Sequence, residues 1–170
     1  MIDRTKDRPP HHASLLRHFA DLRDGTHGGV SRRQDKERLF ADAVTLLDPI
    51  ARAVLVELND DLLLGSGSVE GSGVTRSPDG GVHALWVLSW PEQRTVDIAP
   101  VTIRAHYGRG FHHPHLRGGT VGEWPLNVFD TQQAQEQRPI LAAIATAELH
   151  NLVFQADYRI VPATVKRVGH

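Results

Sequence analysis

Two alternating patterns constrain the fold most strongly, because both predict β-strands and only a short loop separates them. In residues 82–90, every second position is apolar or aromatic, and the positions between them are half apolar. Residues 101–107 alternate again, with apolar side chains at the odd positions. A period of two is typical of strands. The first pattern therefore predicts a central strand, covered on one face and partly on the other, and the second pattern predicts another strand of the same sheet.

A helical pattern precedes these strands. Within residues 31–59, apolar residues recur at alternating spacings of four and three, which predicts one buried face of a long helix. Ser31 with Gln34 three positions later predicts a capping box at the start of this helix. Pro49 predicts either a kink in one helix or the first turn of a second helix.

The flanking segments complete the predicted order of elements. Residues 1–30 predict a mobile or loosely docked extension with a short helix at 13–24. Residues 62–76 contain four glycines, which predicts a poorly packed edge strand. A helix is expected at 139–150, and the alternation in 152–161 predicts a final half-buried strand.

This order predicts a single α+β domain over residues 31–165. N-terminal helices pack on an antiparallel meander of three to five strands, and a loop-rich His/Gly segment follows. A C-terminal helix and strand close the domain.

Composition excludes several classes of protein. The chain has 19 Lys and Arg against 20 Asp and Glu, so it lacks the positive field of a nucleic-acid-binding protein. No apolar run approaches the roughly 20 residues of a membrane span, and the polar N-terminus contains no signal peptide. Cysteine is absent, which excludes disulfides and thiolate chemistry. We therefore expect a cytoplasmic protein that binds neither nucleic acid nor membrane.

Several short motifs follow one another in the middle of the chain. They are Gly80-Gly81, the strand 82–90 closed by Pro91, Pro100-Val101 before the next strand, His113-Pro114-His115, Gly118-Gly119, the segment from Trp124 to Val128, and the helix from Pro139. This order resembles the ubiquitin-conjugating (UBC-like) fold over roughly residues 31–150. In this resemblance, residues 113–115 correspond to the His-Pro-Asn element of the family, and residues 31–58 correspond to its N-terminal helix.

The chain departs from the UBC-like pattern at three points. The catalytic cysteine of the family, expected within residues 122–125, is absent, and His115 stands where the family has asparagine. The predicted strand at 152–161 replaces the family's C-terminal helices. The resemblance therefore implies a non-catalytic variant, which serves as a binding module or as the partner of an active enzyme. A fold alone does not transfer a function.

Histidine is the unusual residue of this composition. Four of the 11 histidines lie within ten positions, and Glu123 follows them; the four are His106, His112, His113 and His115. Imidazole and carboxylate groups are suitable ligands for zinc or iron, and an open site could activate a water molecule. Histidines beside Gly and Pro also commonly hydrogen-bond the backbone or face solvent, and a metal-free acid–base role is a third interpretation.

Three further residues are binding candidates. Arg104 and Arg117 lie near the histidines and could hold an anion or a carboxylate, although a solvated side chain is the default interpretation of an arginine. Trp124 is a candidate for ligand stacking, against the more common packing role of tryptophan. No residue is singled out as catalytic.

Three functions are compatible with these patterns. The first is a non-catalytic protein-binding or accessory domain of UBC-like architecture, without a cofactor. The second is a metal-dependent enzyme whose zinc or iron ion is held by His106, His113 and His115. The third is a structural subunit of a larger assembly, in which the histidine loop and the predicted strand 152–161 form interfaces. Another protein or a second copy of the chain is the expected partner.

Overall fold

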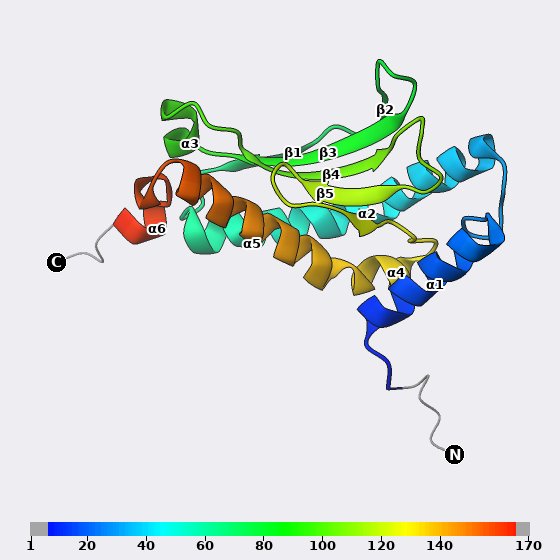
Figure 1. Ribbon diagram of the computed structural model, residues 1–170. Helices are drawn as coiled ribbons and strands as arrows, with labels where there is room; N and C mark the ends of the chain where they lie inside the picture. Colours follow the sequence, from blue (N-terminus) through cyan, green and yellow to red (C-terminus); the bar gives the residue numbers. More distant parts are fainter. Residues whose placement is uncertain (1–6, 166–170) are drawn as a thin grey trace.

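The computed structural model describes residues 7–165 and has the expected α+β architecture (Figure 1). In chain order the elements are α1 (Pro10–Asp24), α2 (Arg33–Leu62), β1 (Ser68–Gly71), β2 (Thr75–Arg76), β3 (Val82–Ser89), α3 (Pro91–Thr95), β4 (Val101–Tyr107), β5 (His115–Gly118), β6 (Trp124–Pro125), α4 (Thr131–Glu136), α5 (Arg138–Gln155), the 3₁₀ helix η1 (Tyr158–Ile160) and α6 (Pro162–Val165).

The sheet has six antiparallel strands, one more than the upper limit of the predicted meander. Its order is β1-β3-β4-β5-β6, and β2 pairs with β3 beside β1. The two-residue strands β2 and β6 add to the predicted number, because such short pairings leave no alternating pattern. The predicted central strand is confirmed, since β3 pairs with β1, β2 and β4.

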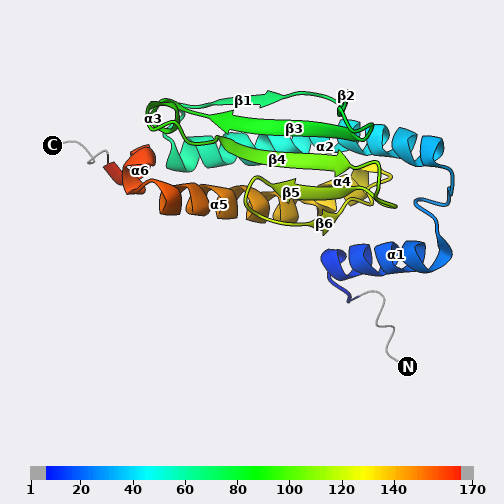
Figure 2. The same cartoon turned by 45° about the horizontal axis from the view of Figure 1, so that its top comes forward.

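Helices α2 and α5 cover the same face of the sheet, as both views show (Figures 1 and 2). The even positions of β3 and the odd positions of β4 are buried against these helices, and Trp86 and Tyr107 are the largest of these side chains. The alternate positions of β3, such as His83, are only half-buried. We call the face that carries these positions the open face of the sheet.

Helix α2 is a single helix that contains Pro49. The neighbouring Asp48 accepts hydrogen bonds from Trp86 Nε1 at 3.0 Å and from Arg52 Nε at 2.9 Å. The hydrogen bond from Trp86 on β3 holds the turn around the proline to the sheet. The predicted capping box is wrong, because the N-cap is Arg32 and its side chain caps nothing. Contacts between Arg33 and the carbonyl groups of the loop after β4 set the helix start instead.

The predicted strand at 152–161 is also wrong. Helix α5 continues to Gln155, and η1 follows. Leu149 and Leu152 are buried three positions apart, which is a helical spacing, whereas Phe154 is 85% exposed. The indole nitrogen of Trp90 donates to the carbonyl of Ile160 at 2.6 Å and fixes the C-terminal turn against the core. A short apolar run fits both the strand period of two and the helical period of about 3.6 residues. Tertiary contacts therefore decide that this segment is helical.

Two predicted helices and the predicted edge strand agree with the structure. The predicted helix at 13–24 lies within α1, and the one at 139–150 lies within α5. The glycine-rich edge strand corresponds to β1 and β2. Residues 1–6, part of the predicted extension, lie outside the described residues. Within residues 7–165, no helix is long and apolar enough to cross a membrane.

Candidate functional site

Three histidines form a row across the open face of the sheet. His83 on β3 pairs with His106 on β4, and His106 pairs with His115 on β5. Side chains of directly paired residues lie on the same face of a sheet. All three are half-buried. His106 and His115 were candidates from the sequence, whereas His83 lies 23 positions before His106 and joins them only through the strand register.

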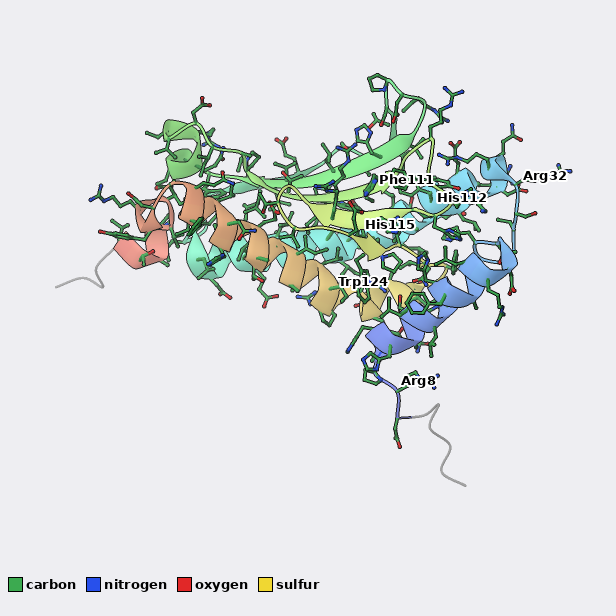
Figure 3. All side chains as sticks on the ribbon, viewed as in Figure 1. Arg8, Arg32, Phe111, His112, His115 and Trp124 are labelled. Atoms are coloured by element: carbon green, nitrogen blue, oxygen red, sulfur yellow. The ribbon has the colours of Figure 1, made fainter. Side chains whose placement is uncertain are left out.

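His106 has a carboxylate partner in Glu123. The Nε2 atom of His106 lies 2.9 Å from Glu123 Oε2, so that an imidazole N–H can donate to the carboxylate. The other carboxylate oxygen lies 3.4 Å from Arg117 Nη1. The ring of Phe111 packs edge-on against His106 and His115, at centroid distances of 6.1 and 6.4 Å; Figure 3 labels Phe111 and His115. A paired imidazole and carboxylate can exchange protons with a ligand on this face.

His113 belongs to a second group, which lies just before β5 and against α1. It is buried, and its Nε2 atom donates to the carbonyl oxygen of Thr26 at 2.8 Å. Its ring lies 5.2 Å from that of His18 and 5.9 Å from that of His27. His18 also lies 5.9 Å from His115. We call His18, His27, His113 and His115 the docking cluster, because they lie where α1 meets the rest of the molecule.

Burial keeps several of these imidazoles neutral. Desolvation, followed by the charge of His113, lowers the pKa of His27 to about 4. The pKa of His18 is lowered by burial and by the neighbouring His113 and His115. Burial likewise lowers the pKa of His115. The interface between α1 and the body therefore depends on neutral imidazoles at neutral pH.

The candidates for a metal site are divided between these groups. His106 contacts Glu123, and His113 contacts Thr26 and α1. His112 is exposed, and its carbonyl oxygen, rather than its ring, makes the contacts with Lys36 and Tyr107. Among residues 7–165, no three His, Asp or Glu side chains are arranged to hold one metal ion. The zinc or iron site stays a prediction.

The other binding candidates lie around the histidine row. Arg104 is exposed on the open face and pairs with Arg117 across β4 and β5. Trp124 is half-buried at the edge strand β6, and its Nε1 atom has no hydrogen-bond partner within the described residues (Figure 3). These residues border the histidine row.

Helix α1 is attached to the body through polar contacts. Ser14 Oγ donates to Asn127 Oδ1, and Asn127 Nδ2 donates to the carbonyl oxygen of Ser14, both at 2.7 Å. The buried His18 is the next contact along the helix. The apolar residues of α1 lie elsewhere: Leu16, Phe19 and Leu22 are 47%, 53% and 52% exposed. We call these three residues the α1 stripe. Figure 2 shows α1 set apart from the two-layer body.

A second apolar surface lies where α2 and α5 run side by side. Its hollow has a volume of about 220 Å³. The lining consists of apolar residues, Val54, Leu58, Leu62, Ala142 and Ala145, together with Glu57, Asp61 and Thr146. We call this surface the α2–α5 groove; its charged side chains are acidic.

Glu148 is a buried residue that sequence reasoning did not identify as important. Its carboxylate accepts hydrogen bonds from Thr120 Oγ1 at 2.7 Å and from the Val121 amide at 2.8 Å. A Cβ at Gly118 or Gly119 would lie against this carboxylate. Gly118 and Gly119 thus leave room for Glu148 to stabilise the turn after β5, which is a structural role.

No family model, curated protein or solved structure matches this chain. The resemblance to the UBC-like fold therefore remains a prediction.

Proposed function

We propose that this protein is a non-catalytic protein-binding domain and that α1 is its binding helix. The observation that carries the proposal is the orientation of α1, which is held by Ser14 and His18 while the α1 stripe faces solvent. Burying one large apolar side chain stabilises a complex by about 1.5–3 kcal/mol. Three such side chains on one helix are typical of a helix that binds in an apolar groove.

The groove that fits this helix is the α2–α5 groove of a second copy. Leu16, Phe19 and Arg23 follow a spacing of three and four, so they share one face of α1. Insertion of Leu16 and Phe19 among the apolar groove residues brings Arg23, which pairs with the exposed Asp24, toward the acidic Asp61. Glu57 is already paired with Arg138 at 2.8 Å. Each chain offers both a helix and a groove, so two copies can exchange helices around a two-fold axis.

Sedimentation velocity over a concentration series tests this proposal. The wild-type chain of 18.8 kDa is expected to shift from monomer toward dimer as its concentration rises. Phe19→Asp is expected to remain monomeric, because a carboxylate cannot be buried unpaired in the groove. Phe154→Asp is the matched control: Phe154 is more exposed than Phe19 and does not line the groove, so this variant should associate like the wild type.

A complementary pair of variants tests the reciprocal arrangement. Leu62→Asp alters the groove and leaves the α1 stripe intact, whereas Phe19→Asp does the opposite. Each variant alone should be monomeric. An equimolar mixture should regain a weaker association, because one intact helix still meets one intact groove. A wild-type chain that stays monomeric throughout, or a Phe19→Asp chain that associates normally, contradicts the proposal.

A further inference from the structure

A polar pocket lies between the first turns of α2 and the loop that follows β4. It has a volume of about 280 Å³, and its lining includes Ser31, Arg33, Lys36, Tyr107, Arg109 and His112. Three of these side chains are cationic, and no lining residue is acidic. Figure 3 labels Phe111 and His112 of this loop, whose carbonyl oxygens contact Arg33 and Lys36 at the start of α2.

Lys36 is the informative residue of this pocket. It is only 6% exposed, yet within residues 7–165 its ammonium group has one hydrogen-bond acceptor, the carbonyl oxygen of His112 at 3.3 Å. No carboxylate of the described residues lies within ion-pair distance of it. An ammonium group carries three donors, and a buried cation is costly unless it is paired. The donors of Lys36 that no described acceptor uses are therefore available to an anionic partner in this pocket.

Arg33 is in the opposite situation. Its guanidinium group donates to the carbonyl oxygens of Tyr107, Gly108 and Phe111 at 3.0–3.1 Å, and it stacks over the Tyr107 ring at 3.5 Å. It also pairs with Glu37 at 3.2 Å. Arg33 is a structural residue that shapes the loop, and its positive charge is already compensated.

Glu37 is not free to compensate Lys36. Burial acts to raise its pKa, but hydrogen bonds from Arg76 and Arg33 outweigh burial and lower the pKa of Glu37. The carboxylate is thus held by two guanidinium groups. Asp35, the acidic residue of the first turn of α2, pairs with Arg38 at 3.7 Å.

Arg109 adds a second uncompensated charge. It is exposed at the pocket and has no ion-pair partner among the described residues. The first-turn amides of α2 also lack a side-chain cap, which favours an anion near the helix start. Two positive charges match a phosphate group, which carries about −1.5 to −2 at pH 7 and offers three acceptor oxygens. A carboxylate would neutralise only one of them.

We propose that this pocket binds a phosphate group, with Lys36 and Arg109 as its charged ligands. The group belongs either to free inorganic phosphate or to a phosphorylated molecule whose remainder projects past the exposed Phe111. The proposal is independent of the binding role of α1, since neither the α1 stripe nor the α2–α5 groove lines this pocket.

Isothermal titration calorimetry at constant ionic strength tests the site, with inorganic phosphate, O-phosphoserine and acetate as probes. The wild-type chain should bind one equivalent of phosphate, and acetate should bind at least about tenfold more weakly. Tighter binding of O-phosphoserine identifies a phosphorylated molecule as the ligand class, whereas tighter binding of inorganic phosphate identifies the free ion.

Variants of the two cations complete the test. Lys36→Met should weaken phosphate binding at least about tenfold, because a charge-assisted hydrogen bond is lost. The same variant should melt at the same or a higher temperature than wild type in phosphate-free buffer, because it removes a buried unpaired charge. Arg109→Ala should weaken binding several-fold, and the control Arg104→Ala on the open face should not change it. Absence of phosphate binding by the wild type, or unchanged binding by a folded Lys36→Met chain, overturns the proposal.

Discussion

His18 and His113 meet edge to face where α1 contacts the body, with ring centroids 5.2 Å apart and ring planes at 89°. Burial lowers the pKa of His18 on α1 and that of His115 on the body, which disfavours protonation of either ring. Asp21 partly compensates a positive charge on His18 or His27, and Glu123 does so for His115, whereas Lys36 disfavours a positive charge on His27. The docking of α1 is therefore sensitive to pH.

We predict that the free energy of unfolding falls as the pH is lowered through the range of these histidines. A histidine whose pKa is lowered by folding binds protons more readily in the unfolded chain. The contribution of His27 to the free energy of unfolding is complete above pH 6.5, its ordinary pKa, and is lost as the pH falls toward about 4, its pKa in the folded chain. For His27 alone the loss is about 3 kcal/mol. His18 and His115 act in the same direction.

Urea unfolding between pH 7.5 and 4.5 measures this effect. His27→Gln should flatten the dependence on pH, because the titrating group is gone. His150→Gln, at an exposed position of α5, should leave the dependence as in the wild type. An identical pH dependence in wild type and His27→Gln would contradict the assignment.

The hydrogen bonds between Ser14 and Asn127 give a second prediction. Asn127→Ala removes both bonds that join α1 to the segment before α4, which costs about 1–3 kcal/mol of docking free energy. Hydrogen exchange followed by mass spectrometry should show at least about tenfold faster exchange in α1, with α2 unchanged. Thr45→Ala, which removes an exposed hydroxyl of α2, is the control and should leave α1 protected. Equal exchange of α1 in both variants would refute this contact.

A third prediction concerns the turn that Glu148 stabilises. Gly118→Ala would place a Cβ 2.6 Å from the Glu148 carboxyl carbon, so the buried carboxylate must move away from its donors. We expect a loss of about 1–3 kcal/mol, measured by chemical denaturation. Gly122→Ala adds a Cβ that meets nothing within 4 Å and should change stability by less than about 0.5 kcal/mol. Equal stability of the two variants would show that the Glu148 carboxylate does not stabilise the turn after β5.

Much of the fold was predictable because its patterns are long. The alternation in residues 82–90 extends over the whole of β3, and the apolar face of residues 31–59 extends over most of α2. The segment 152–161 misled because it is short and its apolar positions fit both a strand period of two and a helical period of about 3.6 residues. Only contacts made elsewhere, such as that between Trp90 and Ile160, distinguish a helix from a strand there.

The candidate site was less predictable, since its parts come from distant segments. Spacing along the chain identified His106, His113 and His115. It could not reveal that His113 faces His18 and His27 while His106 faces Glu123. The α1 stripe was visible as an apolar pattern, but its exposure was not, because an amphipathic helix normally buries its apolar side. The polar contacts of Ser14 and His18 reversed that expectation.

Paramagnetic relaxation between two copies of the chain tests the central claim most directly. The chain contains no cysteine, so Asp24→Cys allows one spin label at the exposed end of α1. Mixed with isotopically labelled, otherwise unmodified chain, it should broaden the amide signals of Ala142, Ala145 and Thr146 on α5 of the other copy. Val96 and Ile98 line a different hollow, after α3 and at the opposite end of the sheet from α1 (Figure 1). Absence of broadening, or broadening only near these two residues, would show that α1 does not bind the α2–α5 groove.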